Sequence, residues 1–127
     1  MKRPEQEIQR AVVQHLHARS VPLVYFFHCP NGGKRSVVEG AIFKSLGVMA
    51  GVPDLIILKA GEMYCLELKA PGGRLSAAQF ITLDRLKHCG ATVATASSLD
   101  EALITLECWG ILKRESVKGV KIEITSV

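Results

Sequence analysis

The sequence predicts an α/β fold: a central mixed β-sheet flanked by helices, in one domain over residues 1–127. Helix-like and strand-like segments follow one another in the order α-β-α-β-β-α-β-α-β, which is typical of a layered sheet with helices beside it. Two strands form a tight hairpin, and helical segments separate the others, so antiparallel and parallel pairing are both expected. At 127 residues, with 48% apolar side chains, the chain can build one core without disulfides.

The first half of the chain predicts a helix, a strand and a second helix. A helix is expected from Pro4 to about Arg19, because apolar residues recur there at helical spacing (Ile8, Ala11, Val12 and Leu16). A β-prone run at 21–27 predicts the first strand, which ends in a turn rich in Pro, Asn and Gly. Residues 38–46 predict a short helix, closed by Gly47.

The second half predicts the hairpin and the remaining elements. Two apolar runs, 55–58 and 63–66, surround a short turn at Ala60-Gly61. Ser76 and Gln79 have the spacing of a capping box, so a helix is expected from there to about Cys89. Its inward stripe is predicted to hold Gln79, Phe80, Leu83 and Leu86. A strand at 92–96, a helix from Ser98 to Trp109 and an edge strand at 120–124 complete the order.

Composition narrows the function classes. The net charge of +4 and the pI near 9 are compatible with a polyanionic partner but do not establish one. The four cysteines and four histidines lack zinc-site spacing, so reduced thiols are expected. No apolar run approaches the ~20 residues that span a bilayer, and the N-terminus lacks a signal-peptide pattern. We therefore expect a cytoplasmic protein without membrane contact.

The predicted hairpin brings two acids and one base together. If its turn centres on Ala60-Gly61, Asp54 lies directly opposite Glu67, and opposed side chains share a face of the sheet. Lys69 lies two residues beyond Glu67 and projects from that face as well. Like charges opposite one another destabilise a sheet unless a cation joins them. Both Lys69 and a divalent metal ion would satisfy that need.

This pattern resembles the active site of the PD-(D/E)xK nuclease superfamily, and within it the VRR-NUC (virus-type replication–repair nuclease) family. The superfamily motif is present as Pro53-Asp54 followed by Glu67-Leu68-Lys69. The resemblance covers about residues 4–96. The further matching segments are Gly51–Leu55, Gly72-Gly73-Arg74-Leu75-Ser76 with Gln79, Glu5-x-x-Ile8-Gln9, and Pro30-Asn31-Gly32-Gly33-Lys34-Arg35. It implies a restriction-endonuclease-like fold and a role for each matched residue.

By this resemblance, Mg²⁺ or Mn²⁺ would be bound by Asp54, Glu67 and the backbone carbonyl of Leu68, with Glu5 as a further ligand, directly or through water. Lys69 would orient or deprotonate the attacking water, and Gln79 would hold Lys69 or that water. The cations expected to clamp DNA phosphates are Lys34, Arg35 and Arg74.

Simpler interpretations stay open at several of these positions. Glu5 and Glu7 both suit the positive end of a helix without any chemistry, although the apolar stripe and the Glu-x-x-Ile match favour Glu5 for the site. Gln79 has a capping role that does not exclude a second one. The basic loop residues have a plain alternative as solvated charges.

The resemblance implies a metal-dependent DNA endonuclease from a phage or bacterium, selective for branched or Holliday-junction DNA. Such a resolvase is expected to be a homodimer, because two coordinated nicks need two sites. Its dimer face would come from Val37, Val38, Ile42 and Phe43 or from the 120–124 edge. The alternatives are a nicking or restriction-like nuclease, a replication-complex subunit, or an inactive DNA-binding module on a nuclease fold.

Overall fold

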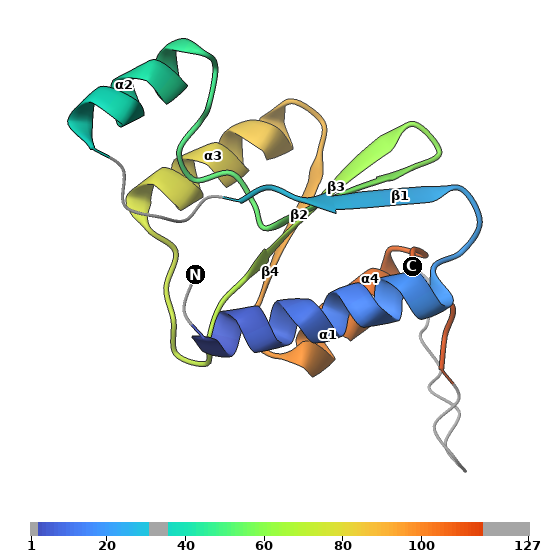
Figure 1. Ribbon diagram of the computed structural model, residues 1–127. Helices are drawn as coiled ribbons and strands as arrows, with labels where there is room; N and C mark the ends of the chain where they lie inside the picture. The colour runs from blue at the N-terminus through green and yellow to red at the C-terminus, as the bar shows by residue number, and fades with distance from the viewer. Residues whose placement is uncertain (1–2, 31–35, 116–127) are drawn as a thin grey trace.

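The computed structural model describes residues 3–30 and 36–115, which form a four-stranded sheet with helices on both faces (Figure 1). The elements are α1 (Arg3–Arg19), β1 (Val24–His28), α2 (Val37–Ser45), β2 (Leu55–Lys59), β3 (Glu62–Leu68), α3 (Ala77–His88), β4 (Thr92–Ala96) and α4 (Leu99–Cys108). This order confirms the prediction through α4. The predicted edge strand at 120–124 lies outside the described residues.

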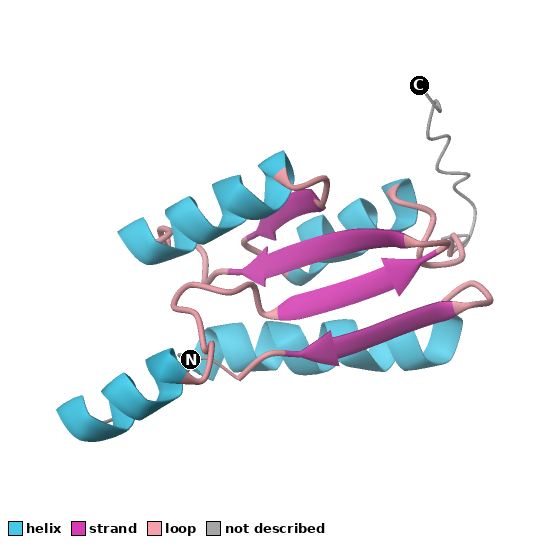
Figure 2. Cartoon of the chain, turned by 90° about the horizontal axis from the view of Figure 1, so that it is seen from above, coloured by secondary structure: helices cyan, strands magenta, loops and turns pink. Residues whose placement is uncertain are grey.

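The sheet is mixed, as predicted. Its order is β1-β2-β3-β4: β2 is antiparallel to both β1 and β3, and β4 is parallel to β3. Helices α1 and α4 cover one face and α3 lies over the other, while α2 stands apart from the sheet (Figures 1 and 2). The parallel pair arises because α3 carries the chain back across the sheet between β3 and β4.

The first strand begins at Val24, three residues later than the sequence pattern predicts. The Val21 N–H donates to the carbonyl of Ile111 at 2.8 Å, away from β2. Pro22 has no N–H to donate, and Leu23 has a φ of 64°, which lies outside the β region. These three residues therefore form the connection from α1, and ladder pairing starts after them.

The β2–β3 hairpin has the predicted turn and register. Ala60 and Gly61 have φ values of 51° and 78°, the pair of positive angles that a type I′ turn requires. Leu55 pairs with Leu66, and Lys59 pairs with Glu62. The hairpin is thus centred on Ala60-Gly61.

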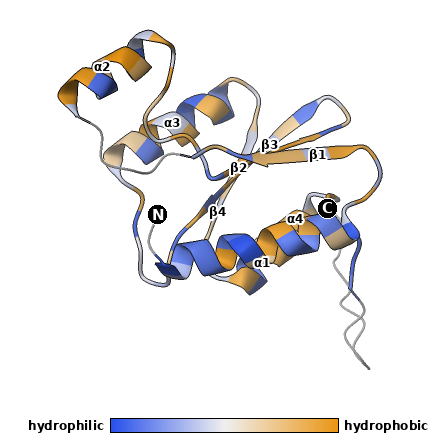
Figure 3. Ribbon diagram, viewed as in Figure 1, coloured by the Kyte–Doolittle hydropathy of each residue, from blue (hydrophilic) through white to orange (hydrophobic). Residues whose placement is uncertain are grey.

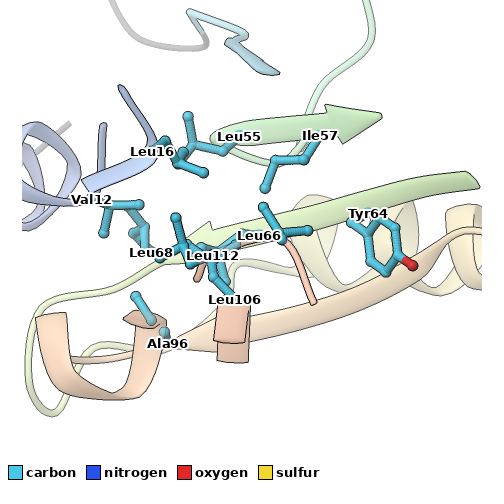
Figure 4. Close-up of a cluster of buried hydrophobic side chains, with 12 residues drawn as sticks. Val12, Leu16, Leu55, Ile57, Tyr64, Leu66, Leu68, Ala96, Leu106 and Leu112 are labelled. Atoms are coloured by element: carbon cyan, nitrogen blue, oxygen red, sulfur yellow. The ribbon is translucent and has the colours of Figure 1, made fainter. Parts of the chain in front are cut away.

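The hydrophobic core lies between the sheet and helices α1 and α4 (Figure 4). Alternate residues of the hairpin strands enter it, and each fully buried Leu or Ile contributes ~1.5–3 kcal/mol. The main members are Val12, Leu16, Leu55, Ile57, Leu66, Leu68, Leu106 and Leu112. Because side chains alternate along a strand, Cys65 and Glu67 project from the opposite face, the side of α3.

Helix α3 has the predicted cap but not all of the predicted stripe. Ser76 and Gln79 form a complete capping box at its start. Leu83 is buried, but Phe80 is 63% exposed, so its predicted inward position is wrong. Gln79 and Leu83 are four residues apart and share one helix face, whereas Phe80 is turned about 100° from Gln79 around the axis.

None of the helices in residues 3–30 and 36–115 is both long enough and apolar enough to cross a membrane.

Candidate active site

Two buried carboxylates lie at the open end of the hairpin. The register that pairs Leu55 with Leu66 places Asp54, one residue further along, opposite Glu67. Asp54 is 7% exposed and Glu67 is 1% exposed, which is unusual because acids are almost never buried unless they are paired. The Asp54 Oδ2 atom accepts a hydrogen bond from the N–H of Leu68 at 2.8 Å. That bond ties the aspartate to the backbone between Glu67 and Lys69.

Glu67 is held in an environment that disfavours its charge. Burial raises the pKa of Glu67 far above its ordinary value, and the hydrogen bond and negative charge of Asp54 raise it further, while Lys69 lowers it. Its Oε2 atom is buried without a hydrogen-bond partner among the described residues. An unsatisfied buried carboxylate oxygen is costly. A cation between the two acids would satisfy it.

Lys69 is oriented by Gln79. The Lys69 Nζ atom donates to Gln79 Oε1 at 2.8 Å, and the same oxygen accepts from the backbone N–H of Ser76 at 2.8 Å. Ser76 Oγ in turn accepts from the Gln79 N–H at 3.1 Å. The predicted capping role and the predicted contact with Lys69 are therefore both present, and they use one atom.

Gly51 fixes the approach to Asp54 against α3. A Cβ atom there would lie 2.4 Å from the carbonyl oxygen of Ala78 and 2.7 Å from the backbone nitrogen of Gln79. Gly51 also has a φ of 75°, which disfavours any other residue. Beside it, the Thr82 hydroxyl donates to the carbonyl of Ala50 at 2.7 Å. The chain entering β2 is thus packed directly on the helix turn that carries Gln79.

A surface pocket of about 550 Å³ opens beside Lys69. Its lining comes from α1, the loop after β3 and the start of α3 (Glu5, Lys69, Ala70, Gly73, Arg74, Ser76 and Gln79). Glu5 is half-buried here, whereas Glu7 is exposed and 3.6 Å from Arg3 in an ion pair. This geometry favours Glu5 over Glu7 as the acid near the site. Arg74 lies in the same pocket, but Lys34 and Arg35 lie outside the described residues.

His28 is a neighbour that sequence reasoning missed. Its Nδ1 atom is 2.7 Å from the backbone carbonyl oxygen of Asp54, to which the Cys29 N–H also donates at 3.2 Å. The pairing of β1 with β2 brings His28 there, because it places His28 opposite Leu55, next to Asp54. The sequence alone indicated two strands but not that they are neighbours.

Comparison with known proteins identifies the family. The model of the VRR-NUC domain matches residues 3–100. The chain belongs to the VRR-NUC family.

Two solved structures share the fold. One, described as a VRR-NUC domain protein, has a TM-score of 0.71 and 23% identity, covering 90% of this chain and 99% of its own. Another, described as a VRR-NUC domain, has a TM-score of 0.57 and 19% identity, covering 82% of this chain and 95% of its own. No curated protein matches the sequence.

Membership of the VRR-NUC family makes this a nuclease-family domain, and the family's nucleases are generally metal-dependent. The residues at the hairpin fit a hard cation, because the donors are carboxylate oxygens and one of them, Glu67 Oε2, lacks a partner among the described residues. In residues 3–30 and 36–115, no group of three acidic, histidine or cysteine side chains gathers around one point.

Proposed function

We propose that this VRR-NUC domain is a metal-dependent DNA endonuclease that hydrolyses phosphodiester bonds, with Asp54, Glu67 and Lys69 as its catalytic centre. One observation carries the proposal: two buried carboxylates lie together beside an ammonium group that is held in place. Buried acids placed side by side destabilise a fold unless a cation compensates their charge. Buried acids with perturbed pKa values also cluster at functional sites.

Each residue has a role in the proposed reaction. Asp54 and Glu67, with the Leu68 carbonyl, would hold Mg²⁺ or Mn²⁺, with Glu5 as a further ligand, directly or through water. The ion would supply charge neutralisation on the phosphate and a more acidic water. Lys69, oriented by Gln79, directs the attacking water and stabilises the charge of the pentacovalent phosphorus. Arg74, which lines the same pocket, holds the phosphate backbone, and Lys34 and Arg35, outside the described residues, are proposed as further phosphate contacts.

The proposed substrate is branched or junction DNA, and the proposed active form is a homodimer. Within the described part of the chain α2 has no buried residue, although it is largely apolar (Figure 3). Val37, Val38 and Ile42 are 91%, 69% and 53% exposed. Clustered apolar residues of this kind mark interaction surfaces. Pairing through α2 would give the two related sites that symmetric cleavage of a junction needs.

A cleavage assay tests the function. Linear, nicked, flapped, forked and four-way DNAs of the same sequence are incubated with the protein and Mg²⁺ or Mn²⁺, with EDTA as the control. We expect paired cuts near the branch of four-way DNA and little cutting of linear duplex. Equal single-strand nicking of every substrate would support the nicking alternative instead. Binding without cleavage under all metal conditions would support the inactive module.

Light scattering tests the dimer. We expect a dimer at micromolar concentration for the wild type and a monomer for Val38→Glu, because a charge in an apolar interface costs several kcal/mol. Glu39→Gln, at an exposed neighbouring position, is the matched control. A wild-type monomer, even with four-way DNA added, would contradict the homodimeric resolvase.

A further inference from the structure

A second groove, with several polar side chains in its lining, lies between α1 and the end of β1. It measures about 480 Å³ and is lined by Gln6, Gln9, Arg10, Val13, Gln14 and His28. Five of its members recur at intervals of three and four residues, so they form one stripe along α1. The lining contains one cation, three amides and an imidazole, and no acid. This is the chemistry that contacts phosphate and sugar.

The groove is joined physically to the candidate active site. His28 lines it while its ring nitrogen contacts the backbone carbonyl of Asp54 at 2.7 Å. Gln9 follows Glu5 by one helical turn, and Glu5 lines the pocket beside Lys69. The two hollows therefore share α1 as a wall, at neighbouring positions of the helix.

The cation in the groove has no partner within the described protein. Arg10 is exposed and makes no hydrogen bond or ion pair with another described residue. The two other arginines of α1 are in ion pairs: Arg3 is 3.6 Å from Glu7, and Arg19 is 3.8 Å from Glu107. Arg10 is therefore available to an anionic ligand.

We propose that this groove binds the DNA backbone next to the scissile phosphate, with Arg10 as the phosphate-contacting residue. This inference rests on the proposed nuclease function and adds a direction for the substrate. Arg10 lies five residues after Glu5, ~7.5 Å further along the helix axis. One strand of duplex DNA carries a phosphate every ~3.4 Å of its axis. A duplex whose axis runs along α1 would thus place a phosphate about two nucleotides from the cleaved one at Arg10.

Binding of fluorescently labelled four-way and linear DNA, measured by anisotropy in EDTA from 50 to 200 mM salt, tests this groove. We expect Arg10→Ala to weaken binding about 3- to 10-fold at the lowest salt. The slope of log affinity against log salt should fall by ~0.9, the loss of one phosphate contact. Arg10→Lys should keep most of the slope. Arg85→Ala, which removes an exposed arginine from α3, is the matched control and should change the slope little.

A scan with single methylphosphonates, which remove one phosphate charge at a time, locates the contact. A neutral linkage about two nucleotides from the cut should weaken wild-type binding but not weaken Arg10→Ala further. Unchanged affinity and slope in Arg10→Ala, or a wild type that binds neither DNA, would overturn the inference. Cleavage by wild type with Mg²⁺ is scored separately. Its presence alongside an unaffected Arg10→Ala would reject the groove and keep the nuclease.

Discussion

The side-chain amide oxygen of Gln79 accepts hydrogen bonds from both the Lys69 ammonium and the Ser76 backbone N–H, each at 2.8 Å. A residue that caps α3 thereby also sets the position of the proposed catalytic lysine. Stability and activity are coupled at this atom, and suitable variants separate them.

Gln79→Ala is expected to lose both effects, and Ser76→Ala only one. Each removes part of the capping box and should cost ~1 kcal/mol of stability. Only Gln79→Ala releases Lys69, so its turnover should fall about 10- to 100-fold, the range expected for a misplaced catalytic group. Urea unfolding and single-turnover cleavage measure the two quantities. Equal turnover in the two variants would show that Gln79 only caps the helix.

The pH dependence of stability should reveal Glu67. In an unfolded chain its pKa is about 4.3, whereas burial and Asp54 raise it in the folded protein. As pH rises through the window between these values, the unfolded chain releases a proton that the folded protein retains, so the metal-free protein loses stability. Glu67→Gln lacks this loss and should be more stable than wild type at pH 7, by on the order of 1 kcal/mol.

Urea unfolding in EDTA at pH 4 and pH 7 measures this effect. The advantage of Glu67→Gln should shrink at pH 4, where wild-type Glu67 is mostly protonated in both states. Asp100→Asn, at an exposed position of α4, serves as a control for the loss of an acid elsewhere. A Glu67→Gln advantage that is absent at pH 7, or equal at both pH values, would contradict the assigned cause.

The two acids of the first turn of α1 should differ in their effect on metal binding. Glu5 lines the pocket with Lys69, whereas Glu7 pairs with Arg3 on the surface. Glu5→Gln should therefore weaken Mn²⁺ binding several-fold, and Glu7→Gln should leave it near wild type. Calorimetric titration of Mn²⁺ into the three proteins decides between them. A larger loss in Glu7→Gln would reverse the assignment.

Gly51→Ala should damage both fold and site. The added Cβ atom would overlap the backbone of Ala78 and Gln79, and the positive φ strains any side chain. We expect a loss of ~1–3 kcal/mol and reduced cleavage. Gly47→Ala is a matched control, because it also has a positive φ but meets no atom within 4 Å. If both variants lose the same stability, the close approach to α3 contributes nothing.

Local patterns predicted much of this fold because local physics decides them. The Ala60-Gly61 turn sets the hairpin register and so brings Asp54 opposite Glu67. The spacing of Ser76 and Gln79 predicts the start of α3 without any distant contact. The errors arise where distant contacts decide. β1 starts late because the Val21 N–H bonds to Ile111, 90 residues away in sequence. Phe80 was placed on the inward stripe of α3 because the apolar stripe was drawn too wide around the helix, and it is exposed instead.

The site was predictable only in part, for the same reason. Asp54, Glu67 and Lys69 belong to one hairpin, so their proximity follows from strand geometry. His28 reaches Asp54 only because β1 pairs with β2, and the groove around Arg10 needs α1 to lie beside that strand. A single sequence carries no local signal for either arrangement.

The most direct test of the proposed catalytic centre is metal-dependent cleavage of four-way DNA by wild type, Asp54→Asn and Lys69→Ala. Asp84→Asn, which changes an exposed acid of α3, is the control. Asp54→Asn removes a metal ligand and Lys69→Ala removes the group that directs the water. We predict that both variants stay folded and bind DNA in EDTA, yet lose cleavage by at least about 100-fold, as for other groups that stabilise a transition state. Wild-type turnover by Asp54→Asn with Mg²⁺ would contradict the proposed centre.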